Sequence, residues 1–142
     1  MRIVLDSNVL ISAIGKKSSF RPIWTAFLSG QYQLILSDEV VYEYEEIIQL
    51  NSAPGASKIV MEILVESQNV VNQQVYYSWN AIKKDPDDNK FFDLAIAGNA
   101  DYLVTNDAHF NVVKKLTFPK VRIINAADFL NILNNQSLQP GL

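Results

Sequence analysis

Strand-like and helix-like segments alternate along this chain, and the alternation constrains the fold more than any other feature of the sequence. Five short apolar runs are candidate strands, at Ile3–Leu5, Gln33–Leu36, Val70–Val71, Tyr102–Val104 and Val121–Ile124. Between them lie segments whose apolar side chains recur at helical spacing. This order is typical of a parallel sheet covered by helices. We therefore predict an α/β fold with a central parallel sheet.

The predicted helices begin and end at residues that suit helix termini. Gly15 and Gly30 end the first two helices, Pro22 opens the second, and Ser37 or Asp38 caps the third. Further helices are predicted over 56–67, from 85 onward, over 110–115 and over 126–133. Four aromatic residues have the spacing of core residues, which predicts packing rather than base stacking; they are Trp24, Phe27, Phe91 and Phe92.

Composition limits both the size of the fold and its chemistry. The 142 residues, 49% of them hydrophobic, suit one domain over 1–134 followed by a flexible tail at 135–142. Cysteine is absent and His109 is the single histidine, which excludes thiolate zinc sites and a two-histidine ribonuclease mechanism. No segment approaches the roughly 20 apolar residues of a membrane span, so we expect a cytoplasmic protein. The net charge of −3 argues against a generic basic nucleic-acid binder.

Acidic residues follow two of the predicted strands, at the edge where a parallel sheet binds ligands. Asp6 comes directly after the first strand, and Asp107 comes shortly after the strand that ends at Val104. Ligands of open parallel sheets bind outside the carboxyl ends of the strands. Glu43, one turn inside its helix, and Asp88, in the first turn of another, can point to the same edge. We therefore predict one site made of these four acids.

Four converging carboxylates require a counter-ion. Two carboxylates about 4 Å apart repel by about 1 kcal/mol in water and about 4 kcal/mol at an effective dielectric constant of 20. Lys90 is the one basic residue close in sequence to any of Asp6, Asp88 and Asp107. Ligation by oxygen alone selects Mg²⁺ or Mn²⁺. Such an ion activates water and stabilises a leaving oxygen, which predicts hydrolysis of phosphodiesters to a 5′-phosphate and a 3′-hydroxyl.

Each acid also has a structural explanation that the sequence leaves open. Asp6 and Asp107 can each cap the helix that follows. Asp88, taken alone, is better explained as the partner of Asp85 in a capping box. Glu43 lies among other glutamates and can be a solvated helix acid.

Further polar residues are predicted to support the site or to contact RNA. Ser7, Asn8, Thr105 and Asn106 can orient the carboxylates or bind metal-linked water, or they can be ordinary turn residues. Asp93 can face the sheet edge or solvent, and we interpret His109 as a surface or capping histidine rather than a ligand. Candidate contacts to RNA phosphates are basic residues near the acids, namely Lys16, Lys17 and Arg21, with Lys83 and Lys84 as a second cluster.

Four blocks of this sequence, in register, resemble the motifs of the PIN domain family. They are Leu5–Leu10, Ser37–Glu43, Asp85–Phe91 and Ala100–Asp107, and the likeness runs from Met1 to about Phe129. They most resemble the toxin components of bacterial type II toxin–antitoxin pairs. Serine replaces the more usual threonine of the first block at Ser7 and keeps the hydroxyl.

The resemblance implies a three-layer α/β/α sandwich and an endoribonuclease that uses one or two Mg²⁺ or Mn²⁺ ions. It also implies a cognate antitoxin and a homodimer. The acids of the family fall on Asp6, Glu43, Asp88 and Asp107, with Asn8 and Asp93 as supporting positions.

Three alternative functions are weighed against the nuclease. A haloacid-dehalogenase-like phosphatase also opens with a strand and an Asp-x-Asp motif, but Asn8 stands here in place of the second aspartate. A phospho-receiver domain needs an acidic pair after the first strand, which this chain lacks. The other alternative is a PIN-fold module that only binds RNA or protein. The presence of all four acids argues against such a loss of activity.

Overall fold

The computed structural model describes residues 1–138 and contains, within them, a parallel sheet of five strands in the order β3-β2-β1-β4-β5. The strands are β1 (Arg2–Leu5), β2 (Gln33–Leu36), β3 (Val70–Asn72), β4 (Tyr102–Val104) and β5 (Ile123–Ile124). The helices are α1 (Ser7–Ile14), α2 (Arg21–Leu28), α3 (Asp38–Asn51), α4 (Ala56–Glu66), α5 (Asn89–Ala97), α6 (Asn111–Lys114) and α7 (Ala126–Leu138), with short 3₁₀ turns η1 (Pro86–Asp88) and η2 (Ala108–Phe110).

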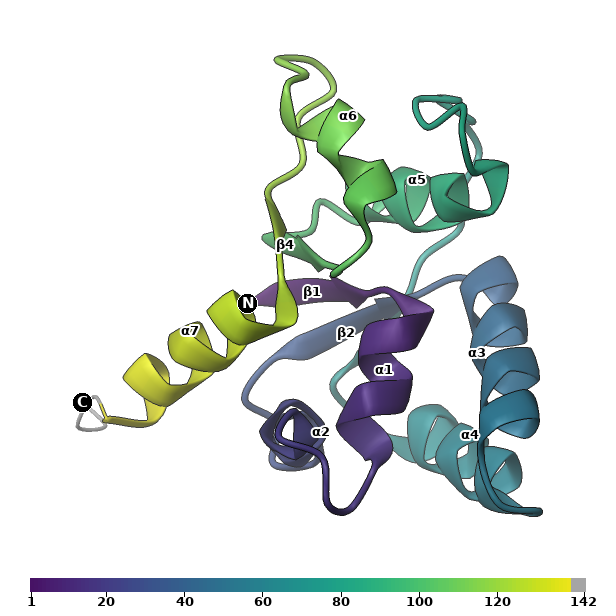
Figure 1. Cartoon of the computed structure of the whole chain (residues 1–142), viewed down its shortest axis with the longest axis vertical. Coiled ribbons are helices and arrows are strands. Elements are labelled where there is room, and N and C mark those ends of the chain that lie inside the picture. Colours follow the sequence, from purple (N-terminus) through teal and green to yellow (C-terminus); the bar gives the residue numbers. More distant parts are fainter. Residues whose placement is uncertain (139–142) are drawn as a thin grey trace.

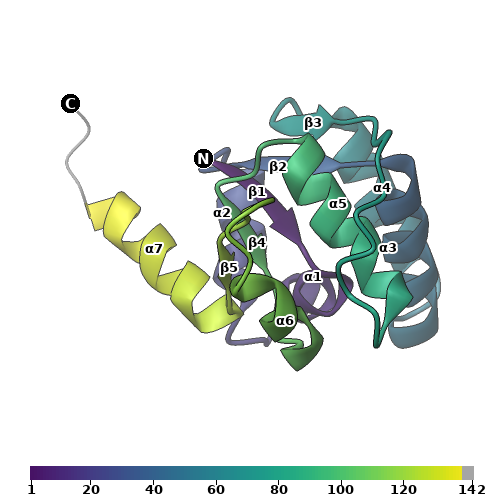
Figure 2. The ribbon, with the colours of Figure 1, turned by 90° about the horizontal axis from the view of Figure 1, so that it is seen from above.

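The sheet lies between two layers of helices. Figure 1 shows α5 and α6 on one side of β1 and β2, and α1 and α4 on the other. Figure 2 gives the same arrangement from above, with α5 lying across the sheet. The predicted α/β/α sandwich around a parallel sheet is therefore confirmed.

The core is built around β1, which both helix layers cover. Ile3 and Val4 are fully buried, and Leu5 is 1% exposed. A strand buried on both faces reads as a continuous apolar run, and this explains why the first strand is so clear in the sequence. The four aromatic residues predicted to pack in the core are all buried; they are Trp24, Phe27, Phe91 and Phe92.

The strand order creates a topological switch point between β1 and β4. The chain passes from β1 to β2 and β3 in one direction, and then returns to place β4 and β5 on the other side of β1. Ligands of open α/β sheets bind at such a point, outside the carboxyl ends of the strands. Leu5 is in register with Val104, so the residues that follow these two strands emerge side by side.

Some element boundaries differ from the sequence predictions. β5 covers only Ile123–Ile124 instead of the predicted Val121–Ile124, because its pairing partner β4 is short and offers only Leu103 and Val104. α7 continues to Leu138, beyond the predicted end of the domain at 134. The rest of the predicted tail, 139–142, lies outside the described residues. Within the described chain, no helix is long and apolar enough to cross a membrane.

Candidate acidic metal centre

Asp6 occupies the end of the central strand and is held there by the neighbouring strand. Its carboxylate is 4% exposed and accepts a hydrogen bond of 2.7 Å from the Thr105 hydroxyl to Oδ2. Asp6 stands at the N-cap position of α1, but its side chain makes no capping hydrogen bond there. Burial raises the pKa of Asp6; the Thr105 hydrogen bond opposes this shift, whereas the charges of Glu43 and Asp107 add to it.

Asp107 is tied to the same threonine. Its backbone N–H donates to Thr105 Oγ1 over 3.0 Å, so one hydroxyl links the two acids that follow β1 and β4. The Asp107 side chain also accepts a bond of 2.9 Å from the His109 N–H and thereby caps η2. The capping role considered for Asp107 is therefore real, and it also fixes the orientation of the carboxylate.

Asp88 is buried without a full set of partners. The residue is 7% exposed, and its Oδ2 atom has no hydrogen-bond donor among the described residues. The capping bond of this turn comes from Asp85, whose Oδ1 accepts from the Asp87 N–H over 3.2 Å. Burial, followed by the charges of Asp107, Asp85 and Asp6, raises the pKa of Asp88 to about 7. A buried carboxylate with a free oxygen requires either a proton or a cation.

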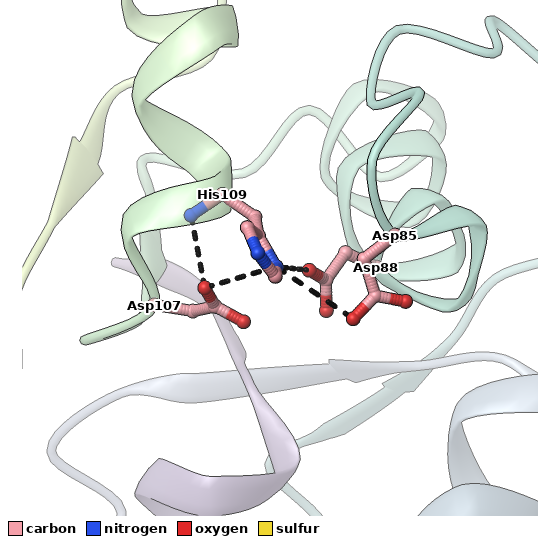
Figure 3. Close-up of side chains that lie close together, drawn as sticks. All are labelled: Asp85, Asp88, Asp107 and His109. Carbon is pink, nitrogen blue, oxygen red and sulfur yellow. Dashed lines mark hydrogen bonds and ion pairs between the residues drawn. The ribbon is translucent and has the colours of Figure 1, made fainter.

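Four side chains from two separate segments converge at this point (Figure 3). Asp85, Asp88, Asp107 and His109 each offer one ligand atom, and these atoms all lie within 4.8 Å of one another. His109 Nδ1 is 3.3 Å from Asp107 Oδ1, 3.5 Å from Asp88 Oδ2 and 3.7 Å from Asp85 Oδ2. We call these four residues the acidic cluster.

His109 and Asp85 are members of the acidic cluster that the sequence interpretation missed. His109 was predicted to be a surface or capping histidine; its side chain is 44% exposed and also faces three carboxylates. Its signal in the sequence is weak, since the nearest aspartate of the other segment, Asp88, lies more than twenty residues away. Only the fold, which sets η2 opposite η1, brings the two together.

Glu43 lies beside the acidic cluster and not within it. Its Oε1 atom pairs with Lys90 Nζ at 2.9 Å, and its Oε2 atom accepts a hydrogen bond from Ser7 Oγ. Its side chain is only 17% exposed, so Glu43 is not a solvated helix acid. Burial lowers the pKa of Lys90, but the hydrogen bond and charge of Glu43 outweigh this and raise it. Glu43 is therefore linked to the site through Asp6, because the negative charge of Glu43 raises the pKa of Asp6.

Among the supporting residues, Thr105 and Ser7 contact the acids, whereas the others do not. Asn106 Oδ1 accepts from the Ala126 N–H over 2.9 Å and so caps α7. Asn8 is exposed on α1. Asp93 is buried, accepts a 3.2 Å bond from the Trp79 N–H and lines a separate polar cleft of about 980 Å³.

The predicted phosphate contacts on the first basic segment lie away from the acids. Lys16 and Lys17 follow the C-terminal end of α1, whereas Asp6 precedes its N-terminal end. An eight-residue helix separates its two ends by about 12 Å. Arg21 donates to the Ile14 carbonyl and so joins α1 to α2. The second basic cluster, Lys83 and Lys84, instead lines a pocket that includes His109.

The donor set of the acidic cluster fits a divalent cation. Three carboxylates and one imidazole meet within 4.8 Å, and Asp88 contributes an oxygen that no protein donor satisfies. Carboxylate oxygens are the preferred ligands of Mg²⁺ and Mn²⁺. Asp6, held by Thr105, adds a further negative charge that acts on Asp88.

Comparison with known proteins agrees with this architecture. The sequence model of the PIN domain matches residues 2–109. No curated protein matches the chain by sequence. The fold is similar to that of VapBC2 from Rickettsia felis, solved bound to a DNA fragment from its promoter, with 17% identity, a TM-score of 0.60 and coverage of 88% of this chain and 98% of that chain.

Two further solved structures share the fold. FitAcB from Neisseria gonorrhoeae has 16% identity and a TM-score of 0.57, with 88% of this chain and 98% of that chain covered. FitAB bound to an IR36 DNA fragment has 15% identity and a TM-score of 0.55, with 87% and 94% covered. At these identities the structural likeness establishes the fold alone. Because the family match spans residues 2–109 of 142, the chain belongs to the PIN domain family.

Proposed function

We propose that this protein is a metal-dependent endoribonuclease and the toxin of a bacterial type II toxin–antitoxin pair. The observation that carries the proposal is the meeting of Asp88 and Asp107 in the acidic cluster, beside Asp6, at the switch point of the sheet. A buried Asp88 oxygen that accepts no hydrogen bond from residues 1–138 is costly for a structural site and useful for a metal site. The PIN domain match supports the same conclusion.

The catalytic set that we propose consists of Asp6, Glu43, Asp88 and Asp107. Asp88 and Asp107, with Asp85 and His109 beside them, would hold the Mg²⁺ or Mn²⁺ ion. When bound, such an ion supplies an activated water and stabilises the charge that develops on the scissile phosphate.

The surrounding residues of the chain orient this set. Thr105 holds Asp6 through a donated hydrogen bond and holds the Asp107 backbone through an accepted one. Ser7 and Lys90 together fix the Glu43 carboxylate, and Lys90 offsets its charge. Fixed carboxylates need no reorganisation when a phosphate and a cation arrive, which is the usual basis of electrostatic catalysis.

The proposed partners are RNA as substrate, a cognate antitoxin, and a second copy of the chain in a homodimer, all in the cytoplasm. The motifs shared with type II toxins, and the fold shared with VapBC2 and FitAB, support an antitoxin partner. A small open reading frame for a DNA-binding antitoxin should adjoin the gene, and its product should co-purify with this chain. If neither is found, a solitary RNA-processing enzyme becomes the better proposal.

The decisive experiment for the nuclease is cleavage of end-labelled single-stranded RNA by the purified full chain. We expect cleavage in Mn²⁺ or Mg²⁺, and loss of cleavage in EDTA and in Asp6→Asn and Asp107→Asn. Asp128→Asn is the matched control, because Asp128 is an exposed aspartate on α7. Cleavage that persists both in EDTA and in Asp6→Asn would rule out the carboxylate–metal mechanism.

The same preparations separate the alternatives. A binding module without catalysis would be stabilised by Mn²⁺ in thermal denaturation but would leave RNA intact. A phosphatase would hydrolyse a phosphate monoester such as p-nitrophenyl phosphate. We expect no monoester hydrolysis, because Asn8 is exposed on α1 and cannot act as an acid.

A further inference from the structure

An apolar pocket adjoins the acidic cluster. It has a volume of about 320 Å³ and lies between the strap 81–84 and the segment made of η2 and α6. Ala81, Ile82, Ala108 and Val112 form its walls, and His109 belongs to both the pocket and the acidic cluster. Val112 is 51% exposed, so its apolar side chain faces solvent at this place. The pocket therefore offers an apolar surface directly beside the proposed site of cleavage.

The strap that forms one wall of the pocket is fixed by a pair of hydrogen bonds. The Asn89 side chain accepts from the Ile82 N–H over 2.9 Å and donates to the Ile82 carbonyl over 2.9 Å. The Ile82 side chain is 1% exposed and anchors the strap in the core. Since the wall is anchored before any ligand arrives, little ordering is needed on binding.

Two lysines give the apolar pocket a positive lining. Lys83 and Lys84 both line it and are both exposed. Within residues 1–138 neither lysine lies within ion-pair distance of an acid, in contrast to Lys90, which pairs with Glu43. Exposed lysines next to an acidic cluster provide local positive charge on a chain whose net charge is −3.

An aromatic patch continues from the pocket along the same two chain segments. Trp79 lies in the irregular segment that leads into the strap, and Phe118 lies in the loop that follows α6. The Trp79 ring is 4.7 Å from Tyr77 and 5.8 Å from Phe118 between centroids, in edge-to-face contacts. Tyr77 is 64% exposed and Phe118 is 80% exposed. These three residues form what we call the aromatic patch.

We propose that the apolar pocket, its two lysines and the aromatic patch form one seam that binds single-stranded RNA beside the scissile phosphate. The pocket receives one unstacked base, Lys83 and Lys84 contact backbone phosphates, and the aromatic patch stacks further bases. The proposal rests on the proposed nuclease function and adds to it the path that the strand takes over the surface. His109 faces the acidic carboxylates (Figure 3) and also lines the pocket, so it connects this path to the proposed site of cleavage.

The chemistry of the seam favours single-stranded RNA over a duplex or a protein segment. Aromatic faces and apolar pockets take bases only when these are unstacked, as in single strands and loops. The lysines match the charge of phosphates, whereas a protein segment would need no such row of cations beside an acidic site. Duplex RNA hides its base faces, so the aromatic patch would have nothing to stack on.

Binding to the seam can be measured without cleavage, on the full chain in EDTA. The probe is a single-stranded RNA of about 12 nucleotides, read by tryptophan fluorescence and by anisotropy of an end label. Trp24 is 4% exposed and Trp79 is partly exposed, so quenching reports on Trp79. We expect quenching by the single strand and none by the matching duplex. A single strand that binds without quenching, or a duplex that quenches equally, would overturn the proposal.

Variants of the seam then give the quantitative test. Tyr77→Ala with Phe118→Ala should raise the Kd for single-stranded RNA about tenfold or more, because each lost stacking contact weakens binding. Tyr76→Ala is the matched control, because Tyr76 is 88% exposed on the same segment but lines the separate polar cleft. Both aromatic side chains are exposed, so their removal should leave the fold intact, which thermal denaturation will verify.

The lysines are tested through the dependence of binding on salt. Replacement of Lys83 and Lys84 by Gln should reduce the salt slope of log Kd by about one to two, whereas Lys58→Gln on α4 should leave it unchanged. Kd values within about twofold of wild type for all seam variants would overturn the proposal. Altered Kd without Mn²⁺-dependent cleavage would refute the nuclease but keep the seam, whereas cleavage with unaltered Kd would do the reverse.

Discussion

Replacement of Asp88 by Asn should stabilise the metal-free protein, and the gain should grow with pH. Burial and the neighbouring acids raise the pKa of Asp88 to about 7 from the ordinary value of 3.8. A carboxyl whose pKa is raised in the folded state binds its proton more tightly there. Its contribution to stability is therefore present below pH 4, falls as pH rises towards 7, and stays at its lowest value above pH 7.

The size of the effect follows from this shift. One pKa unit corresponds to about 1.4 kcal/mol, so the ionised carboxylate costs the folded state about 4 kcal/mol at pH 8 and below about 2 kcal/mol at pH 5. An Asn side chain has nearly the same shape and no charge in this pH range. The advantage of Asp88→Asn over wild type should therefore widen by about 2.5 kcal/mol between pH 5 and pH 8.

Urea denaturation in EDTA at several pH values between 5 and 8 measures this difference. Asp128→Asn, which removes an exposed aspartate, should show a constant difference from wild type across the range. Saturating Mn²⁺ at pH 8 should stabilise wild type and have little effect on Asp88→Asn, since ligand binding stabilises only the state that binds. A difference between Asp88→Asn and wild type that does not change with pH would refute the reasoning.

Three further substitutions test the support of the site and of the sheet. Thr105→Val should lose about 1–3 kcal/mol of stability together with RNA cleavage, because Asp6 loses its hydrogen bond. Thr105→Ser keeps the hydroxyl and should retain both stability and cleavage. Equal behaviour of the two variants in denaturation and cleavage assays would count against this role of Thr105. Gly98→Ala should cost about 1–3 kcal/mol in urea denaturation, because the new Cβ would lie 2.8 Å from Ile35 Cγ2, and an unchanged midpoint would contradict the clash. Lys90→Gln should cost about 1 kcal/mol of stability at pH 7, because the raised pKa of Lys90 keeps the lysine charged there and its stabilising contribution is complete. That contribution is lost only as pH rises through the pKa of Lys90 in the folded state. A wild-type protein that has already lost this stability at pH 7 would disprove the role of Lys90.

The fold could be predicted largely from the sequence because its central strands are buried on both faces. The apolar run Ile3, Val4 and Leu5 predicts an interior strand, and all three residues are buried. The glycines and capping residues that end the helices depend only on neighbouring residues, so they can be recognised from the sequence. The end of the sheet was harder to predict. Val121 is apolar and 7% exposed, but a residue can be buried in the core without pairing in a strand. The apolar pattern therefore predicted a longer β5 than the structure has.

The candidate site was predictable where a strand ends and unpredictable where two loops meet. The positions of Asp6 and Asp107 follow from the strands before them and from sheet register. The His109 side chain faces the carboxylates only because η2 packs opposite η1, and no local sequence pattern predicts this packing. The salt bridge that draws Glu43 towards Lys90 likewise joins residues of two different helices.

The single hydroxyl of Thr105 bonds the acids that follow two different strands, and this determines when during synthesis their arrangement can form. Synthesis runs from the N-terminus, so Asp6 is made before β2 and β3, whereas Thr105 and Asp107 are made only after β4. Until β4 has docked against β1, Asp6 lacks its hydrogen bond from Thr105, and the acidic cluster lacks Asp107 and His109, two of its four members. The bonded arrangement of the two strand-end acids thus depends on the long-range pairing of β1 with β4 and cannot form in a chain that ends before β4.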